Sequence, residues 1–221
     1  MGADPIGGPR PAAGARRIGP PDTNVLRWVG QQYACREDQL TQLLTRTGHQ
    51  ATRSTAVTRR ITARWMNLGL VDRATFLASE PPWIWLTRAG LREVGLPFRV
   101  WQPKAWMLAH VAAINRVRLF VEPRRPAARW VPERQLRRQP GEHPVPDAEI
   151  HDPGGTVTAV EVDLSRKSTE RRRQVMRALV DHYDSVWYFA SVAAWDAVHD
   201  ASCAVPVHLT DLVRIYSLED C

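Results

Sequence analysis

Apolar side chains recur with helical spacing in three stretches near the beginning of the chain. The first stretch follows a candidate helix cap at Thr23-Asn24, and the second follows Cys35. The third runs from Ser54 or Thr55 to Leu68, and its apolar residues, spaced four, four and three apart, form one stripe: Val57, Ile61, Trp65 and Leu68. We therefore predict three helices, the last of them amphipathic and ended by a glycine.

Two short apolar segments and another helix follow. Residues 70–73 and 83–87 are predicted strands, joined by residues 74–82 into a hairpin, and a short helix begins at residues 87–91. Three helices followed by a hairpin is the element order of a winged helix-turn-helix. The phrase Trp85-Leu86-Thr87-Arg88-Ala89-Gly90 resembles the hydrophobic-Leu-Thr-x-x-Gly segment that closes the wing in many such domains. We predict this domain for residues 23–96, with the wing beside the DNA backbone.

The third predicted helix would be the recognition helix, because one of its faces is rich in arginine. Base contacts are expected from residues near its beginning: Arg53, Ser54, Thr55, Thr58 and Arg59. Arg60 and Arg64 lie on the same predicted face and are further DNA-binding candidates. The alternative is a small helical module whose arginines are only solvated.

A proline-marked junction over residues 96–103 separates this region from the rest of the chain. A helix is predicted over residues 104–117, with the following residues up to 122 as a strand or a helix end. Residues 123–144 are rich in proline and arginine and predict a basic connection, with a strand and a short helix within residues 130–138. His110, in the middle of the helix, is expected to be a hydrogen-bonded histidine rather than a metal ligand.

Strand and helix patterns alternate in the remainder of the chain. Strands are predicted at residues 147–150 and 157–164 around a Gly154-Gly155 turn, and a long helix over residues 169–184. Then come a strand at 185–190, a helix at 193–200, a strand at 205–209 and one further strand within 211–216. The fold class is α/β (α+β overall), with an α-β-β-α-β-α-β order over residues 103–221.

Acidic residues mark the ends of the first two of these strands. Asp147 opens the first strand, and Glu161 and Asp163, two residues apart on the second, leave the same face of the sheet. Lys167 follows four residues later. Carboxylates that converge beside a lysine can hold a divalent metal and act on a phosphodiester.

This order and these acids resemble the nuclease core named for its PD-(D/E)XK motif. Pro146-Asp147 matches the first acid and Glu161 the second. The resemblance implies one or two Mg²⁺ (or Mn²⁺) ions, held by Asp147, Glu161 and Asp163, if the site is active, and otherwise no cofactor. The third motif position, however, is Asp163 and not lysine.

Three alternatives follow from this departure from the motif. Lys167 reaches back to replace the missing lysine, the site no longer cleaves, or the acids are structural. In the structural case Asp163 and Ser165 cap the next helix, and an arginine pairs with Glu161.

The composition favours a nucleic-acid partner. The 221 residues carry a net charge of +7, and the isoelectric point is about 10.0. Three scattered cysteines predict neither a zinc site nor disulfides, which suggests a cytoplasmic location. Residues 1–22 are rich in glycine and proline and are expected to be a disordered tail. We expect no membrane span and no signal peptide.

The whole arrangement also resembles the plasmid replication-relaxation family. The matching words are the Trp85–Gly90 phrase, Leu108-Ala109-His110, Pro146-Asp147-Ala148 and Val160-Glu161-Val162-Asp163. The resemblance implies a double-stranded DNA partner and a role in plasmid or mobile-element replication, transfer or transcriptional control. Winged helices often dimerise, so a homodimer is also expected.

Two other functions stay open from the sequence. One is a Mg²⁺-dependent endonuclease that uses Asp147, Glu161, Asp163 and Lys167. The other is a protein-interaction module in which exposed tryptophans, for example Trp83 or Trp130, supply the interface.

Overall fold

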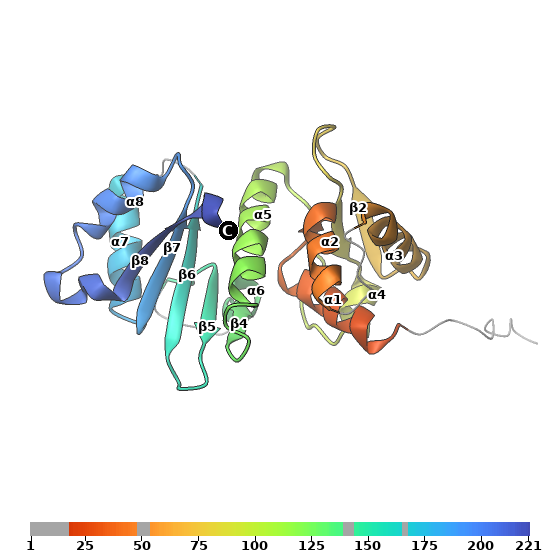
Figure 1. The fold of residues 1–221 in the computed structure, drawn as a ribbon, viewed down its shortest axis with the longest axis horizontal. Coiled ribbons are helices and arrows are strands. Elements are labelled where there is room, and N and C mark those ends of the chain that lie inside the picture. Colours follow the sequence, from red (N-terminus) through yellow and green to blue (C-terminus); the bar gives the residue numbers. More distant parts are fainter. Residues whose placement is uncertain (1–17, 48–53, 139–143, 165–167) are drawn as a thin grey trace, which may run out of the picture.

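The chain is a mixed α/β protein built on two separate sheets (Figure 1). The computed structural model describes residues 18–47, 54–138, 144–164 and 168–221. The N-terminal sheet has three strands in the order β1-β3-β2, and the C-terminal sheet has five in the order β4-β5-β6-β7-β8. Each sheet is covered by its own helices and buries its own apolar clusters.

The predicted N-terminal helices and hairpin are present. The elements are α1 (Pro20–Gln31), β1 (Cys35–Arg36), α2 (Glu37–Arg46), α3 (Thr55–Asn67), β2 (Val71–Ala74), β3 (Trp83–Leu86) and α4 (Arg88–Glu93). Helix α1 begins before the predicted cap, because two prolines occupy its first turn, where a missing N–H group costs no hydrogen bond. Thr23 therefore lies inside the helix, and its hydroxyl donates to the Gly19 carbonyl (3.2 Å).

Strand β1 is an element that the pattern did not predict. Cys35 and Arg36 pair antiparallel with Ile84 and Trp83 of β3. Two residues are too few to show an alternating pattern, so only the pairing partner defines this strand. It completes a three-stranded sheet with the β2–β3 hairpin.

The Leu-Thr-x-x-Gly phrase has a clear structural cause. The Thr87 hydroxyl accepts a hydrogen bond from the Gly90 N–H (3.1 Å) and donates to the Gly69 carbonyl (2.6 Å). A Cβ atom at Gly90 would lie 2.0 Å from the Leu70 carbonyl oxygen. The phrase therefore caps α4 and lets it lie directly on the backbone that enters β2.

Helix α5 (Ala105–Val121) lies between the two sheets, as Figure 1 shows. It continues four residues beyond the predicted helix, through the stretch expected to be a strand or a helix end. Leu119 belongs to the N-terminal core, whereas Ile114 and Val117 pack on the five-stranded sheet. Because α5 contributes to both cores, it belongs structurally to both halves of the chain and not only to the C-terminal one.

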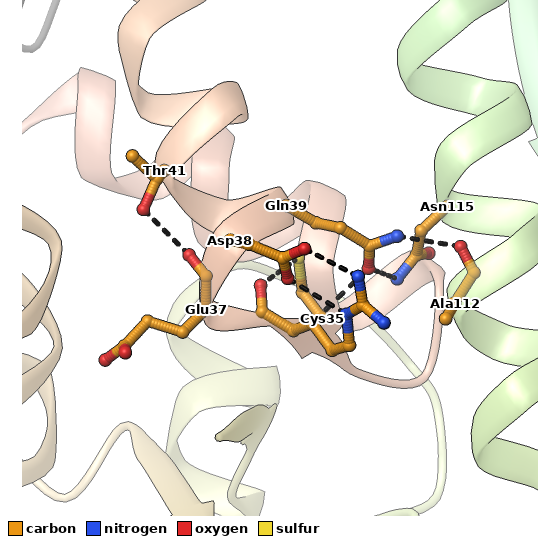
Figure 2. Close-up of polar contacts among 8 residues, drawn as sticks. Cys35, Glu37, Asp38, Gln39, Thr41, Ala112 and Asn115 are labelled. Atoms are coloured by element: carbon orange, nitrogen blue, oxygen red, sulfur yellow. Dashed lines mark hydrogen bonds and ion pairs between the residues drawn. The ribbon is translucent and has the colours of Figure 1, made fainter. Parts of the chain in front are cut away.

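Polar contacts between α2 and α5 fix the two halves against each other (Figure 2). The Gln39 amide donates to the Ala112 carbonyl (2.7 Å). The fully buried Asn115 amide donates to the Ala34 carbonyl (2.8 Å) and to Gln39 Oε1 (3.2 Å). Both amide nitrogens are thereby paired where the surrounding residues exclude water, whereas Asn115 Oδ1 has no hydrogen-bond partner among the described residues.

The C-terminal half follows the predicted alternation with one exception. Its elements are β4 (Arg129–Pro132), α6 (Glu133–Leu136), β5 (Ala148–His151), β6 (Val157–Asp163), α7 (Thr169–Val180), β7 (Ser185–Ala190), α8 (Trp195–Ser202), η1 (Val207–Leu212), β8 (Val213–Ser217) and η2 (Leu218–Asp220). The strand predicted at 205–209 is wrong. That stretch contains Pro206 and enters the 3-10 helix η1, and Val207 is 89% exposed.

The five-stranded sheet combines two kinds of pairing. Strands β4, β5 and β6 are antiparallel, and β6, β7 and β8 are parallel. Met176 and Leu179 of α7 and Val198 of α8 bury one face, and α5 buries the other. The helix before β7 crosses between parallel strands, as parallel pairing requires.

Candidate functional site

The three predicted acids line one pocket of about 410 Å³ beside the five-stranded sheet. Asp147 directly precedes β5, and Glu161 and Asp163 leave one face of β6, as predicted from their spacing. Tyr188 of β7 is the register partner of Glu161 and lines the same pocket. Arg172 of α7 lines it from the helix side. Residues far apart in the sequence thus form one acidic centre, defined by Asp147, Glu161, Asp163, Arg172 and Tyr188.

Both carboxylate oxygens of Asp147 have partners. Its Oδ1 lies 2.9 Å from His110 Nε2, and its Oδ2 accepts a hydrogen bond from the Val162 N–H (2.8 Å). The Asp147 side chain is 13% exposed. The expectation that His110 is hydrogen-bonded is confirmed, and α5 thereby holds the first acid in place.

Asp163 is paired with an arginine in the protein interior. Arg172 Nε donates to Asp163 Oδ2 at 2.9 Å, and the two side chains are 1% and 3% exposed, respectively. Water screens such a pair very little. The structure thus places an arginine on Asp163, and the arginine expected on Glu161 in the structural interpretation stays a prediction. Helix α7 is capped by Ser168, whose hydroxyl accepts from the Arg171 N–H (3.3 Å), so the predicted cap at Asp163 is wrong.

Tyr188 contributes a buried hydroxyl group to the centre. The residue is 2% exposed, and its oxygen has no hydrogen-bond partner in the described part of the chain. Burial and the nearby negative charges of Glu161 and Asp163 raise the pKa of this hydroxyl well above its usual value. The group therefore stays protonated at neutral pH and is a donor.

The rim of the pocket connects to the N-terminal half. Glu133 of α6 accepts from Arg137 Nε (2.6 Å) through one oxygen and from the Tyr33 hydroxyl (3.0 Å) through the other. Tyr33 has a φ of 72°, an unusual backbone conformation for a tyrosine. The ring of Tyr33 also lies 4.6 Å from the Arg134 guanidinium carbon. Sequence reasoning gave no signal for this contact, because the partners are 100 residues apart.

Two of the three acids that the nuclease resemblance assigns to Mg²⁺ already have other hydrogen-bond partners. One oxygen of Asp163 accepts from a guanidinium, and both oxygens of Asp147 already accept or share hydrogen bonds. Within residues 18–47, 54–138, 144–164 and 168–221, no group of three His, Cys, Asp or Glu residues is placed to hold a metal ion. Lys167 lies outside the described residues, so its predicted reach toward the acids stays a prediction.

Helix α3 presents most of its predicted DNA-binding residues at the surface. Thr55, Arg59, Arg60 and Arg64 are exposed, and Ser54 is partly exposed at the helix start. Thr58 is a correction, since it is 1% exposed and its hydroxyl shares a 2.8 Å hydrogen bond with that of Thr41. Arg53 lies outside the described residues.

Two of the exposed arginines on α3 are oriented by buried acids. Arg59 Nε contacts Glu37 at 3.3 Å, and Arg73 of β2 contacts the other oxygen of Glu37 at 3.1 Å. Arg64 donates to both oxygens of Asp22 (2.5 and 2.6 Å). The side chains of Arg59 and Arg64 are nevertheless 64% and 50% exposed. Their positions are therefore set while a large part of each side chain stays accessible.

The tryptophans suggested for a partner surface are in the core. Trp83 and Trp130 are 1% and 7% exposed. Trp106 at the start of α5 is instead 76% exposed, with the Lys104 ammonium 5.9 Å from its ring. Periodicity did not single out Trp106, because apolar residues are mixed over all faces of that helix.

Comparisons of the chain with protein-family models, with curated proteins and with solved structures found no match. In the described part of the chain, no helix is long and apolar enough to cross a membrane. Cys35, Cys203 and Cys221 are all free thiols. The arginine face of α3 and the acidic centre are therefore the two surfaces that bear on the function of this chain.

Proposed function

We propose that this protein binds double-stranded DNA through helix α3, in the manner of a winged helix-turn-helix. The order α1-β1-α2-α3-β2-β3 and the antiparallel β1-β3-β2 sheet support the proposal. In such domains the helix after the turn enters the major groove. Trp65, which is fully buried, anchors α3 to the core and leaves the opposite face for a partner.

The observation that carries the proposal is the arginine face of α3. Arg59, Arg60 and Arg64 are exposed on one helix of a chain with a net charge of +7. Arg60 has no acidic partner among the residues that the structure describes. Guanidinium groups in this setting bind phosphate oxygens and the edges of guanine.

The hairpin loop has a different chemistry from the helix. Residues 75–82 contain no lysine or arginine, and they include the acidic Glu80. Arg73 lies at the base of the hairpin, in β2. We therefore assign the phosphate contacts to α3 and Arg73 rather than to the tip of the wing.

The C-terminal half is proposed to be nuclease-like but not to cleave DNA. Support for the nuclease-like fold comes from the α5-β4-α6-β5-β6-α7-β7 order and from acids at the ends of β5 and β6. The Asp163–Arg172 pair supports the absence of cleavage. Together with the matching sequence words, these features favour a role in plasmid or mobile-element replication, transfer or transcriptional control.

The DNA-binding proposal is tested by fluorescence anisotropy with a labelled DNA duplex across a salt series. We expect the affinity to fall steeply as salt rises, because counterions are released from the DNA. Arg60→Ala is expected to weaken binding by about tenfold and to reduce the slope of log K against log salt by about one. Arg92→Ala, which removes an exposed arginine on α4, serves as the control. Equal effects of the two variants, or no binding by the unaltered protein, would refute the proposal.

The absence of cleavage is tested on supercoiled plasmid with Mg²⁺ or Mn²⁺. We expect the unaltered protein and Asp147→Ala to leave the plasmid intact. Nicking that depends on Asp147 would establish the endonuclease alternative, with Asp147 in the site. Nicking by both proteins alike would indicate a contaminating activity and would leave our expectation for this centre unchanged.

A further inference from the structure

We propose that Arg172 is the resident cation of the acidic centre and that its guanidinium replaces the divalent ion that a nuclease centre holds. This inference rests on the nuclease-like part of the proposed function. It does not depend on DNA binding by α3. According to this inference, Arg172 determines whether the centre binds a metal ion or stays metal-free.

The contact between Arg172 and Asp163 is the first support. The 2.9 Å hydrogen bond from Nε to Oδ2 joins two side chains that are at most 3% exposed. A cation that coordinates Asp163 would have to approach an oxygen that already accepts from a guanidinium. It would also meet a like charge where the protein screens it weakly.

The position of Arg172 is fixed by the helix that carries it. Ser168 caps α7, so Arg172 lies in the first turn, above the end of β6. Met176 and Leu179, on the same helix, are fully buried against the sheet. Because the helix is anchored on both sides of Arg172, its side chain cannot leave the pocket without exposing Asp163 or moving α7.

The other charges around the pocket agree with a guanidinium as the central cation. Glu133 is paired with Arg137 at the rim, and Asp147 contacts His110 and the Val162 N–H. Arg171, the neighbour of Arg172 in the sequence, lines the pocket but is exposed. Arg172 is thus the arginine of the described pocket lining that is both buried and ion-paired to one of the three predicted acids.

Replacing Arg172 should create a metal site. In Arg172→Met, an uncharged side chain of similar length leaves Asp163 without its guanidinium, in the pocket that Glu161 also lines. A divalent cation then becomes the favourable counterion for these carboxylates. Arg172→Lys keeps a positive charge in the pocket and should not gain metal affinity.

The experiment measures Mn²⁺ binding to the full chain by isothermal titration calorimetry and by the shift of the thermal unfolding midpoint. We expect Arg172→Met to bind Mn²⁺ at least about tenfold more tightly than the unaltered protein and to be stabilised by it. Arg171→Met is the matched control, because it removes a pocket arginine that is exposed. The double variant Asp163→Asn/Arg172→Met should lose the gained affinity. Tight binding by the unaltered protein, or no gain in a folded Arg172→Met, would overturn the inference.

A second measurement keeps the inference testable if Arg172→Met does not fold. In the unaltered protein, the Arg172 Nε–H resonance is followed by ¹⁵N NMR while Mn²⁺ is added. A resident guanidinium predicts that this resonance stays sharp at substoichiometric Mn²⁺. Its selective broadening would place the paramagnetic ion in the pocket and overturn the inference. Neither measurement uses DNA, so the failure of DNA binding and the failure of this inference are distinguishable.

Discussion

Two tyrosines in the same apolar cluster differ in how their hydroxyl groups are satisfied. The Tyr183 hydroxyl donates to Glu149 Oε1 at 2.8 Å. The Tyr188 hydroxyl is buried in the acidic centre without a hydrogen-bond partner among the described residues. Burial and neighbouring carboxylates raise the pKa of both groups above the usual value, so both are neutral donors in the folded protein.

Removing these hydroxyls should have opposite effects on stability. Tyr188→Phe is expected to raise the free energy of unfolding by about 1 kcal/mol, because it deletes a donor whose desolvation is not compensated. Tyr183→Phe is expected to lower it by about 2 kcal/mol, since it removes a hydrogen bond to a carboxylate. Urea unfolding of both variants provides the test. A loss of stability in Tyr188→Phe as large as that in Tyr183→Phe would show that the Tyr188 hydroxyl has a partner.

The three cysteines should differ sharply in reactivity. Cys203 is exposed, Cys35 is fully buried, and burial raises the pKa of the Cys221 thiol to about 11. Since the thiolate is the reactive form, a pKa two units above the ordinary value leaves about a hundredfold less of it. At pH 8 we expect one thiol to react rapidly with a disulfide reagent, and mass spectrometry should locate it at Cys203. Rapid modification of Cys35 would contradict the core described here.

For single residues, the sequence predicted where a side chain lies on its strand or helix better than which residue it contacts. The spacing of Glu161 and Asp163 correctly placed both on one face of β6. Arg172 was not found as the partner of Asp163, because the pairing depends on how α7 crosses the sheet, which local patterns do not specify. Thr58 was placed on the arginine face, although its hydroxyl reaches Thr41 of α2 in the buried helix pair. In both cases tertiary packing decided the outcome.

Among the elements, α4 shows how a short sequence phrase specifies a packing geometry. The Gly90 position has no room for a side chain, because a Cβ would lie 2.0 Å from the Leu70 carbonyl oxygen. That carbonyl also accepts from the Thr87 N–H at 3.0 Å, so it cannot move away freely. The glycine is therefore required for the contact of α4 with β2 and not for an unusual backbone conformation.

Gly90→Ala should consequently be strongly destabilising. We expect it to lower the free energy of unfolding by about 3 kcal/mol, because the helix must shift to relieve the overlap. The matched control is Gly154→Ala, since a Cβ there meets no atom within 4 Å and Gly154 does not have a positive φ. Chemical denaturation compares the two variants. Similar midpoints for both would mean that α4 does not lie on β2 as described.

Elements with a strong pattern were predicted well, and elements defined by long-range pairing were not. The apolar stripe of α3 and the six residues of β7 gave nearly the observed bounds. Strand β1 has two residues and exists only through its pairing with β3. The further strand predicted within residues 211–216 corresponds to β8, whereas the apolar run around Pro206 resembled a strand but enters a 3-10 helix.

For the whole molecule, α5 makes the two sheets depend on each other. It contributes Leu119 to the N-terminal core and Val117 to the C-terminal one. Trp28 of α1 also donates to Glu122, just after α5, at 2.9 Å. A boundary drawn at the proline-rich junction, as the sequence suggests, therefore passes through a packed region. We expect the unaltered protein to unfold in a single cooperative transition.

Asn115 is the residue that best tests this dependence. Its amide donates to the Ala34 carbonyl and to Gln39, and its side chain is fully buried between the halves. Asn115→Leu keeps a similar volume but leaves the Ala34 carbonyl without this donor and Gln39 Oε1 with only the Arg36 N–H, which should cost about 2 kcal/mol. Differential scanning calorimetry should then show a lower midpoint and two separated transitions, the earlier one from the N-terminal half. Asn67→Leu, at an exposed position of α3, is the control and should retain one transition. A single unshifted transition in Asn115→Leu would mean that the α2–α5 contacts do not couple the two cores.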